Sequence, residues 1–299
     1  MHRWTRKALC GVNRTVGGWL PAGTLARSVP GIPGPVHVDD QMYRSDAPEH
    51  VRHYVEDAQS AMDNIAQSLA ATGRSFDDVE SCLDFACGYG RVTRWLARAL
   101  GPARVAAADV DSQAVRFCAR SFGVSALPSQ RDPARIDVRG SYDLIFVGSL
   151  LTHLPIPACA TTLHALRAAL RPDGLLVFST QGESCLTHLE WYGPEFVAAA
   201  DEFRMHVARD GAHFVTYAGR RDYGITILTP RAVETLVEPE ATPTLTLVRF
   251  AERGWDRHQD VWAYQRAGRD AVTPVRASST GACASASAPG AASPRAGRP

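Results

Sequence analysis

Short apolar runs alternate with amphipathic segments between residues 81 and 180. The apolar runs predict strands over 82–86, 104–108, 124–127, 144–147 and 175–179. Helical spacing of apolar residues predicts helices over 92–100, 112–121 and 157–170. Repeated strand–helix units predict a parallel sheet with right-handed crossovers. Because the strands are apolar at nearly every position, we expect helices on both faces of the sheet.

The flanking segments extend this α/β pattern. Apolar residues recur at helical spacing over 48–71, and Gly73 ends that pattern. Later in the chain, a helix is predicted over 230–237, and strands over 244–250 and 260–266 are typical of a hairpin. Residues 184–223 lie between the alternating region and the helix predicted over 230–237, and they form a polar, aromatic and irregular insertion.

The two ends of the chain differ from the middle. Residues 1–38 contain no acidic residue and show helical spacing before Pro21, which predicts a basic arm packed on the body. Contact with a partner or a membrane surface is the alternative. Proline and glycine residues then predict a loop over 21–35. The last residues, 267–299, are rich in Ala, Ser and Pro, which predicts a disordered tail.

The composition is that of a chain with a sizeable core, since 45% of its 299 residues are hydrophobic. The net charge of +1 provides no field that would favour nucleic acid as a partner. No apolar run reaches the ~18 residues of a membrane span, so no integral membrane segment is expected. No pattern in the chain indicates an oligomeric state.

Cysteine and histidine usage gives no sign of a metal cage. The seven cysteines form no C-x-x-C pair and are odd in number, which argues against a disulfide framework and favours a reducing, cytoplasmic compartment. Asn13 and Arg14 interrupt the apolar residues near the start, so no secretory signal is expected. His50 and His53 lie one turn apart on a predicted helix, but we interpret them as surface residues and predict no metal site.

A glycine turn follows the first strand of the alternating region. Gly88 and Gly90 match the first two glycines of the dinucleotide fingerprint G-x-G-x-x-G, but Thr93 stands at the third. Free N–H groups at such a turn bind ligands closely. Asp84, inside the strand, suits a cationic amino group better than a pyrophosphate. The turn therefore favours a nucleoside that carries an amino acid.

Asp109 ends the second strand, 21 residues beyond Gly88. A carboxylate at this spacing accepts hydrogen bonds from ribose hydroxyls. Asp111 precedes the next predicted helix, and we interpret it as the N-cap.

Four segments resemble, in order and spacing, the class I S-adenosylmethionine-dependent methyltransferases. They are D-F-A-C-G-Y-G at 84–90, A-A-D-V-D at 107–111, Y-D-L-I-F-V-G-S-L-L-T-H-L at 142–154 and L-R-P-D-G-L-L-V-F at 170–178. The resemblance implies a Rossmann-like, doubly wound α/β fold with a seven-stranded sheet, mostly parallel with one antiparallel strand. It also implies a methyltransferase domain over 48–266, preceded by an arm and lid over 1–47 in which Tyr43 and its neighbours close the pocket.

The resemblance further implies S-adenosylmethionine as the cofactor. The implied contacts are Asp84, Phe85, Ala86, Cys87, Gly88, Gly90 and Asp109, with Val110 against the adenine. The turn Gly148, Ser149 and Leu150 would lie beside the methionine portion. Asp132 is the residue we favour for the adenine-binding position within the stretch 129–132.

Methyl transfer from a sulfonium is a direct displacement, and a general base is needed only when the acceptor must lose a proton early. His153, just beyond the fourth strand, is the first candidate base, and Glu183, just past the fifth, is the second. A structural role for His153 at a helix start is the alternative. Three histidines of the insertion could also face the acceptor: His188, His206 and His213.

The acceptor itself is not specified by these patterns. The aromatic residues of the insertion could stack on a sugar or aromatic acceptor, or they could form a small satellite core. Segments 40–43 and 258–262 faintly resemble methyltransferase domains found beside glycosyltransferases. We expect a small-molecule or saccharide acceptor that is methylated on oxygen or nitrogen.

Three other functions compete with this interpretation. A nicotinamide-dependent oxidoreductase is disfavoured by Thr93 and Asp84. A non-catalytic domain that keeps the fold for binding is a second alternative. A nucleic-acid methyltransferase is disfavoured because Gly148-Ser149-Leu150-Leu151 stands where an Asn/Asp-Pro-Pro-aromatic motif is expected, and no concentrated basic face is evident.

Overall fold

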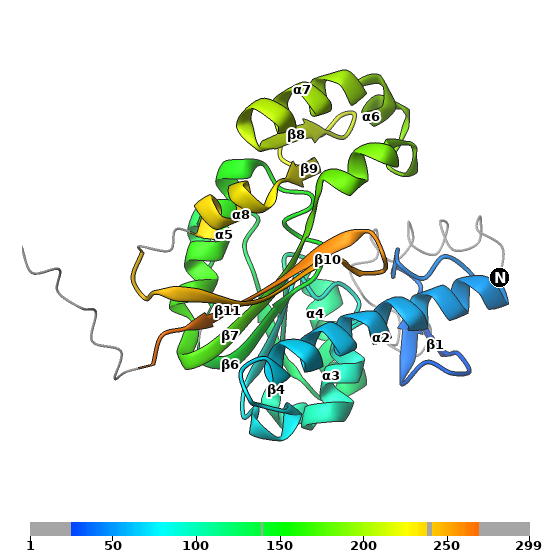
Figure 1. Cartoon of the computed structure of the whole chain (residues 1–299). Helices are drawn as coiled ribbons and strands as arrows, with labels where there is room; N and C mark the ends of the chain where they lie inside the picture. The colour runs from blue at the N-terminus through cyan, green and yellow to red at the C-terminus, as the bar shows by residue number, and fades with distance from the viewer. Residues whose placement is uncertain (1–24, 139, 238–240, 269–299) are drawn as a thin grey trace, which may run out of the picture. The chain divides into compact units, whose positions relative to one another are not determined.

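A nine-stranded mixed sheet forms the centre of the fold (Figure 1). The structure is a computed structural model that describes residues 25–138, 140–237 and 241–268. Residues 1–24 of the predicted arm and residues 269–299 of the predicted tail lie outside the described residues. Seven strands follow one path in the order β10-β11-β7-β6-β3-β4-β5. Their bounds are β3 Cys82–Phe85, β4 Val105–Asp109, β5 Ser125–Pro128, β6 Tyr142–Val147, β7 Leu170–Gln181, β10 Leu245–Trp255 and β11 Gln259–Arg266.

Strand directions agree with the predicted sheet. The five strands β3 to β7 run parallel, as the β3–β4, β3–β6, β4–β5 and β6–β7 pairings record. β11 pairs antiparallel with both β7 and β10. The expectation of seven mostly parallel strands with one antiparallel strand is therefore confirmed for this path. The order reverses at β3, because β4 leaves on one side and β6 on the other, and ligands bind at such a point in open α/β sheets.

Alternating side chains place two apolar layers on the sheet, as a strand period of two requires. On one face, Cys82, Leu144 and Val177 join a core that includes Ile65 of α2 (Pro48–Ala70) and Leu96 of α3 (Thr93–Leu100).

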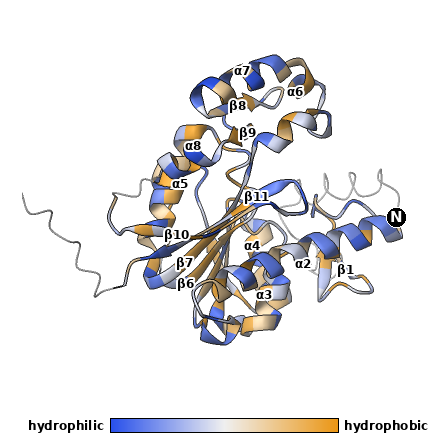
Figure 2. Cartoon of the chain, in the orientation of Figure 1, coloured by the Kyte–Doolittle hydropathy of each residue, from blue (hydrophilic) through white to orange (hydrophobic). Residues whose placement is uncertain are grey.

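On the other face, Leu83, Ile145 and Phe178 pack with Leu163 of α5 (Ile156–Ala168) and Val233 of α8 (Pro230–Val237). The expected doubly covered sheet is confirmed, and its middle strands are coloured hydrophobic in Figure 2.

Helix boundaries agree with the apolar spacing to within one or two residues. α2 begins with Pro48 in its first turn, and it buries Tyr54, Ala58, Ile65 and Leu69 at intervals of three to seven residues. α4 (Ser112–Phe122) ends at Gly123, which takes the left-handed conformation with φ 73°. None of the helices in the described ranges has the length and apolar character that a bilayer crossing requires.

The insertion contains more regular structure than its sequence pattern predicts. It holds α7 (Ala200–Asp210), β8 (Ala212–Thr216) and shorter helical turns, and β9 (Gly224–Leu228) follows it. β8 and β9 pair antiparallel, and β9 joins the main sheet through one parallel pair, Gln181 with Ile227. The expectation of an irregular segment was wrong here because α7 buries only Phe203 and Val207, which gives it a weak helical period.

Two smaller differences concern loops. Residues 25–38 contain a two-stranded hairpin, β1 (Ala26–Ser28) with β2 (Pro35–His37), where a loop was predicted. The predicted Pro-Asp-Gly turn at 172–174 instead lies within β7, with Asp173 at φ 62° and a register shift against β6. β7 accommodates these residues as an irregularity, so it begins at Leu170 and not at 175.

Candidate cofactor and acceptor site

A cavity of about 460 Å³ lies at the carboxyl ends of the parallel strands. Its volume falls within the usual range of small-molecule sites. The end of β3 and the glycine turn contribute residues 84–89, the end of β4 contributes 109–111, the segment after β5 contributes 129–131, and the turn after β6 contributes 148–150. The N-terminal segment adds 39–42, and His153, Asp222, Tyr223 and Trp255 complete the parts used below.

Both glycines of the turn have a left-handed backbone, and at Gly90 the neighbouring side chains also exclude a Cβ. Gly90 has φ 77°, and a Cβ there would lie 2.5 Å from Phe122 Cε2 and 2.9 Å from Cys118 Sγ. Gly88 has φ 51° and donates its N–H to the Asp109 carboxylate. Gly90 does not itself line the cavity, so its contribution is to the shape of the turn.

Asp84 is a buried carboxylate at the cavity wall, with 2% of its surface exposed. The Thr93 hydroxyl donates to Asp84 Oδ2 at 2.6 Å, so the residue that replaces the third fingerprint glycine orients this carboxylate. Burial raises the pKa of Asp84 to about 7, against the partial lowering by the Thr93 hydrogen bond. A cationic ligand group beside Asp84 would lower that pKa and stabilise the charged form.

Asp109 links the glycine turn to the end of β4. Its carboxylate accepts the N–H of Gly88 at 2.8 Å and that of Asp111 at 2.9 Å. Burial raises its pKa, and these backbone hydrogen bonds oppose the increase. A carboxylate has about four acceptor positions, so two hydrogen bonds leave capacity for ribose hydroxyls. Asp111 caps α4 through the N–H groups of Gln113 and Ala114, which confirms its predicted role.

Besides Gly90, two predicted site residues do not line the cavity. Asp132 is exposed, and its side chain caps a short 3₁₀ helix by accepting the N–H of Ala134 at 3.0 Å. Its neighbours 129–131 do line the cavity. Glu183 is exposed at the first residue of the 3₁₀ helix Glu183–Thr187 and lies outside the lining. The remaining predicted cofactor residues, Phe85, Ala86, Cys87, Val110, Gly148, Ser149 and Leu150, all line it.

A ring of three hydrogen bonds holds the turn after β6. The Ser149 N–H donates to Ser179 Oγ at 2.8 Å, and the Ser179 hydroxyl donates to Gln259 Oε1 at 2.7 Å. Gln259 Nε2 donates in turn to Ser149 Oγ at 3.0 Å. Ser149 has φ 56°, an unfavourable conformation for a residue with a Cβ, and the ring compensates for that cost.

His153 lines the cavity four residues after Ser149 of the turn that follows β6. Its Nδ1 is 2.8 Å from the Gly224 carbonyl, which can only accept a hydrogen bond, so Nδ1 carries the proton. Nε2 is then the unprotonated nitrogen. Burial lowers the pKa of His153, so the ring is neutral near pH 7. Its ring stacks on Tyr223 at 4.9 Å between centroids.

Residues 82–174 match a protein family described as a methyltransferase domain. They contain the glycine turn, Asp109 and His153, in a fold with the doubly wound sheet described above. This chain therefore contains a class I S-adenosylmethionine-dependent methyltransferase domain. A comparison with curated proteins gave no match.

Solved structures share the fold of this methyltransferase at low sequence identity. A protein from Pyrococcus horikoshii OT3 is 14% identical, covers 75% of this chain and 95% of its own, and has a TM-score of 0.51. The N-methyltransferase NodS from Bradyrhizobium japonicum WM9, in complex with S-adenosyl-L-homocysteine, is 18% identical. The match covers 76% of this chain and 92% of NodS, with a TM-score of 0.45. Magnesium protoporphyrin IX methyltransferase from Synechocystis PCC 6803, with bound S-adenosyl-L-homocysteine, is 14% identical. The match covers 76% of this chain and 92% of that protein, with a TM-score of 0.48.

Trp255 lines the cavity, although nothing in the sequence pattern indicated this role. A Cβ on Gly148 would lie 2.5 Å from Trp255 Cη2, so the indole requires glycine at that turn. The indole Nε1 donates to the Asp57 carbonyl at 2.9 Å, and the Arg91 guanidinium lies 5.6 Å above the ring. Arg91 also forms an ion pair with the Asp57 carboxylate. The connection of the C-terminal hairpin therefore belongs to the cofactor end of the cavity.

The insertion forms the satellite core that was one of its two predicted roles, and one of its aromatic residues also lines the cavity. Phe196 and Phe203 are fully buried in a satellite core with Ile225 and Ile227. Tyr223, at the end of the same segment, lines the cavity beside His153. Neither His188, His206 nor His213 is among the lining residues. The expectation that these three histidines face the acceptor is therefore wrong for the cavity described here.

Proposed function

We propose that this methyltransferase moves the methyl group of S-adenosylmethionine to an oxygen or nitrogen of a small-molecule or saccharide acceptor, with His153 as the general base. One observation carries the proposal. The Gly224 carbonyl fixes the Nδ1 proton of His153, which leaves Nε2 as an acceptor in the cavity that also contains Asp84 and Asp109. A neutral imidazole is the form of histidine that can remove a proton.

The donor assignment rests on the same cavity. We assign Asp84 to the ammonium group of the methionine portion, Asp109 to the ribose hydroxyls and Val110 to the adenine. Residues 129–131 line the cavity, whereas Asp132 caps a short 3₁₀ helix. We therefore favour one of residues 129–131 for the remaining adenine contact. Residues 148–150 then flank the methionine portion, and residues 39–42 act as the lid.

The reaction in this proposal is a direct displacement. The acceptor atom forms a bond to the methyl carbon while the carbon–sulfur bond breaks and its electron pair returns to sulfur. A hydroxyl acceptor gives its proton to Nε2 of His153, and an amine gives up its proton after the transfer. S-adenosylmethionine supplies the activated methyl group, so the task of the chain is alignment, exclusion of water and proton removal.

The acceptor side of the cavity supports a ring with polar substituents. Tyr223 offers a face for stacking, which is favourable for aromatic and sugar rings. Arg131 and Asp222 lie at this side of the cavity with their charged atoms 4.0 Å apart, and both are exposed. Such a pair can exchange its mutual contact for hydrogen bonds to hydroxyl or amide groups.

The cellular setting that we propose is the cytoplasm, without a nucleic-acid partner. The five cysteines of the described ranges are free and buried, which supports a reducing compartment. The net charge of +1 supports an acceptor other than a polyanion.

Turnover and binding measured side by side test the proposal. Calorimetry should give saturable binding of S-adenosylmethionine, and an acceptor panel of sugars, phenols and amines should release S-adenosylhomocysteine. Binding without turnover on any acceptor would support the non-catalytic alternative. A thermal shift with NAD and none with S-adenosylmethionine would support an oxidoreductase, although Thr93 fills the position of the third fingerprint glycine.

A further inference from the structure

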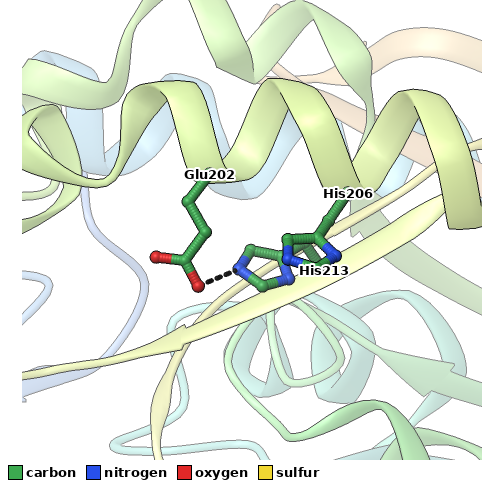
Figure 3. Close-up of side chains that lie close together, drawn as sticks. All are labelled: Glu202, His206 and His213. Carbon is green, nitrogen blue, oxygen red and sulfur yellow. Dashed lines mark hydrogen bonds and ion pairs between the residues drawn. The ribbon is translucent and has the colours of Figure 1, made fainter.

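A second cluster of chemically active side chains lies in the insertion, apart from the cavity lining. Glu202 and His206 stand one helical turn apart on α7, and His213 faces them from β8 (Figure 3). One potential ligand atom from each side chain lies within 4.8 Å of the other two. Glu202 is exposed and both histidines are half-buried, so solutes can reach the cluster.

The distances are close to those of a metal site. His213 Nε2 lies 3.0 Å from Glu202 Oε1, and the two imidazole rings stack with centroids 4.4 Å apart. Ligand atoms at about 2.0–2.1 Å from a tetrahedral ion stand about 3.3 Å from one another. Side-chain rotations that move the ligand atoms by about 1–1.5 Å would therefore bring all three to one ion. Two imidazoles and one carboxylate are a ligand set that Zn²⁺ accepts.

His206 also has an outer partner of the kind that metal-bound histidines use. Its Nδ1 lies 3.1 Å from Asp210 Oδ2 and 2.9 Å from the Arg209 guanidinium. Nδ1 donates to Asp210 in one tautomer and accepts from Arg209 in the other. An ion on Nε2 selects the tautomer that donates to Asp210, and such a carboxylate orients the ring.

We infer that Glu202, His206 and His213 bind a divalent transition-metal ion of the Zn²⁺ type. The ion connects α7 to β8 across Gly211, which has the left-handed conformation with φ 78°. Because no member of the cluster lines the cavity, the ion stabilises the insertion and takes no part in methyl transfer. The inference is independent of the proposed function.

Calorimetric titration of the chelator-treated, full-length chain with Zn²⁺ alone tests the site. We expect saturable binding of one ion, and a Tm increase of roughly 5–10 °C when free Zn²⁺ exceeds its Kd a hundredfold. The double variant His206→Gln/His213→Gln should lose this binding, and Asp210→Ala should weaken it about 10–100-fold.

The matched control is the double variant His50→Gln/His53→Gln, which removes two other histidines one turn apart. It should bind Zn²⁺ with unchanged affinity. The inference is overturned if the wild-type chain shows no saturable one-to-one binding, or if the His206→Gln/His213→Gln variant retains it. Circular dichroism of each variant without metal separates loss of the site from loss of the fold.

Discussion

The donor side and the acceptor side of the cavity are held in place by different means. Asp84 and Asp109 belong to the central strands, and each is fixed by hydrogen bonds from the glycine turn or the helix that follows it. Tyr223 belongs to a segment with its own satellite core, which joins the main sheet through a single strand pair at Gln181. This difference suggests that the acceptor side can change in evolution without disturbing the donor side.

His153 lies where the two sides meet, since it follows the turn after β6 and hydrogen-bonds to Gly224 of β9. Replacement by glutamine should lower kcat/KM by about 10²–10⁴-fold, because proton removal is lost. The affinity for S-adenosylmethionine should be unchanged in calorimetry. Glu183→Gln, at an exposed carboxylate outside the cavity, is the control and should leave both quantities as they are. An equal loss of donor affinity in His153→Gln would assign His153 to the donor side.

Asp84→Asn tests the donor side. Loss of a charged partner for the ammonium group should weaken S-adenosylmethionine binding about 10–150-fold, since such hydrogen bonds contribute about 1.5–3 kcal/mol. The same change should stabilise the unliganded protein at pH 8 by roughly 2–4 kcal/mol, because a buried charge is removed. Calorimetry and denaturant unfolding measure the two effects.

The sign of the stability effect follows from the pKa of Asp84. Burial raises this pKa in the folded state to about 7, above the unfolded value of about 3.9. Between these values the folded state holds the proton more tightly, so the free energy of unfolding falls as pH rises. The advantage of Asp84→Asn should therefore shrink as pH is lowered from 8 towards 4. A pH-independent advantage would show that charge burial at Asp84 is not its cause.

Asp109 and Asp132 form a matched pair of carboxylates, one in the cavity lining and one outside it. Asp109→Asn should weaken S-adenosylmethionine binding about tenfold, the size expected when a charged hydrogen bond to ribose becomes neutral. Asp132→Asn keeps an N-capping side chain and should leave the affinity unchanged. Equal effects of the two substitutions, measured by calorimetry, would contradict the ribose assignment.

Of these substitutions, Tyr223→Leu should have the smallest effect, and it should affect only the acceptor. Loss of ring stacking should raise the KM for the acceptor by about two- to tenfold, while kcat and the KM for S-adenosylmethionine stay constant. Steady-state kinetics with each substrate varied in turn measure this. Tyr192→Leu is the control and should leave both KM values unchanged, because Tyr192 belongs to the satellite core, contacts the ring of Phe196 and is not a lining residue.

Much of the fold could be predicted because its information is local. Central strands covered on both faces, such as β6, are apolar at nearly every position, and helices such as α4 carry both an apolar stripe and an N-cap. β9 was missed because its five buried residues resemble any short apolar run. The β1–β2 hairpin was missed because three-residue strands depend on partners and not on a pattern.

The site could be predicted only where motif and position coincide. Asp84, Asp109 and His153 were singled out because they lie at or near the ends of predicted strands, where sequence alone places the edge of the sheet. Ser179, Gln259 and Trp255 were missed, since their contacts join residues 30 to 198 positions apart. Asp132 was favoured over its neighbours for its charge, but that charge is used to cap a helix turn.

Trp255 also bears on when during synthesis the cavity can first bind its ligand. Its indole contacts the Asp57 carbonyl across 198 residues, and contacts at such separations form slowly. A chain still on the ribosome can form β3 to β6 before residue 255 has been made, but the wall beside Gly148 is then missing. The ligand therefore meets a complete cavity only after the last hairpin has emerged.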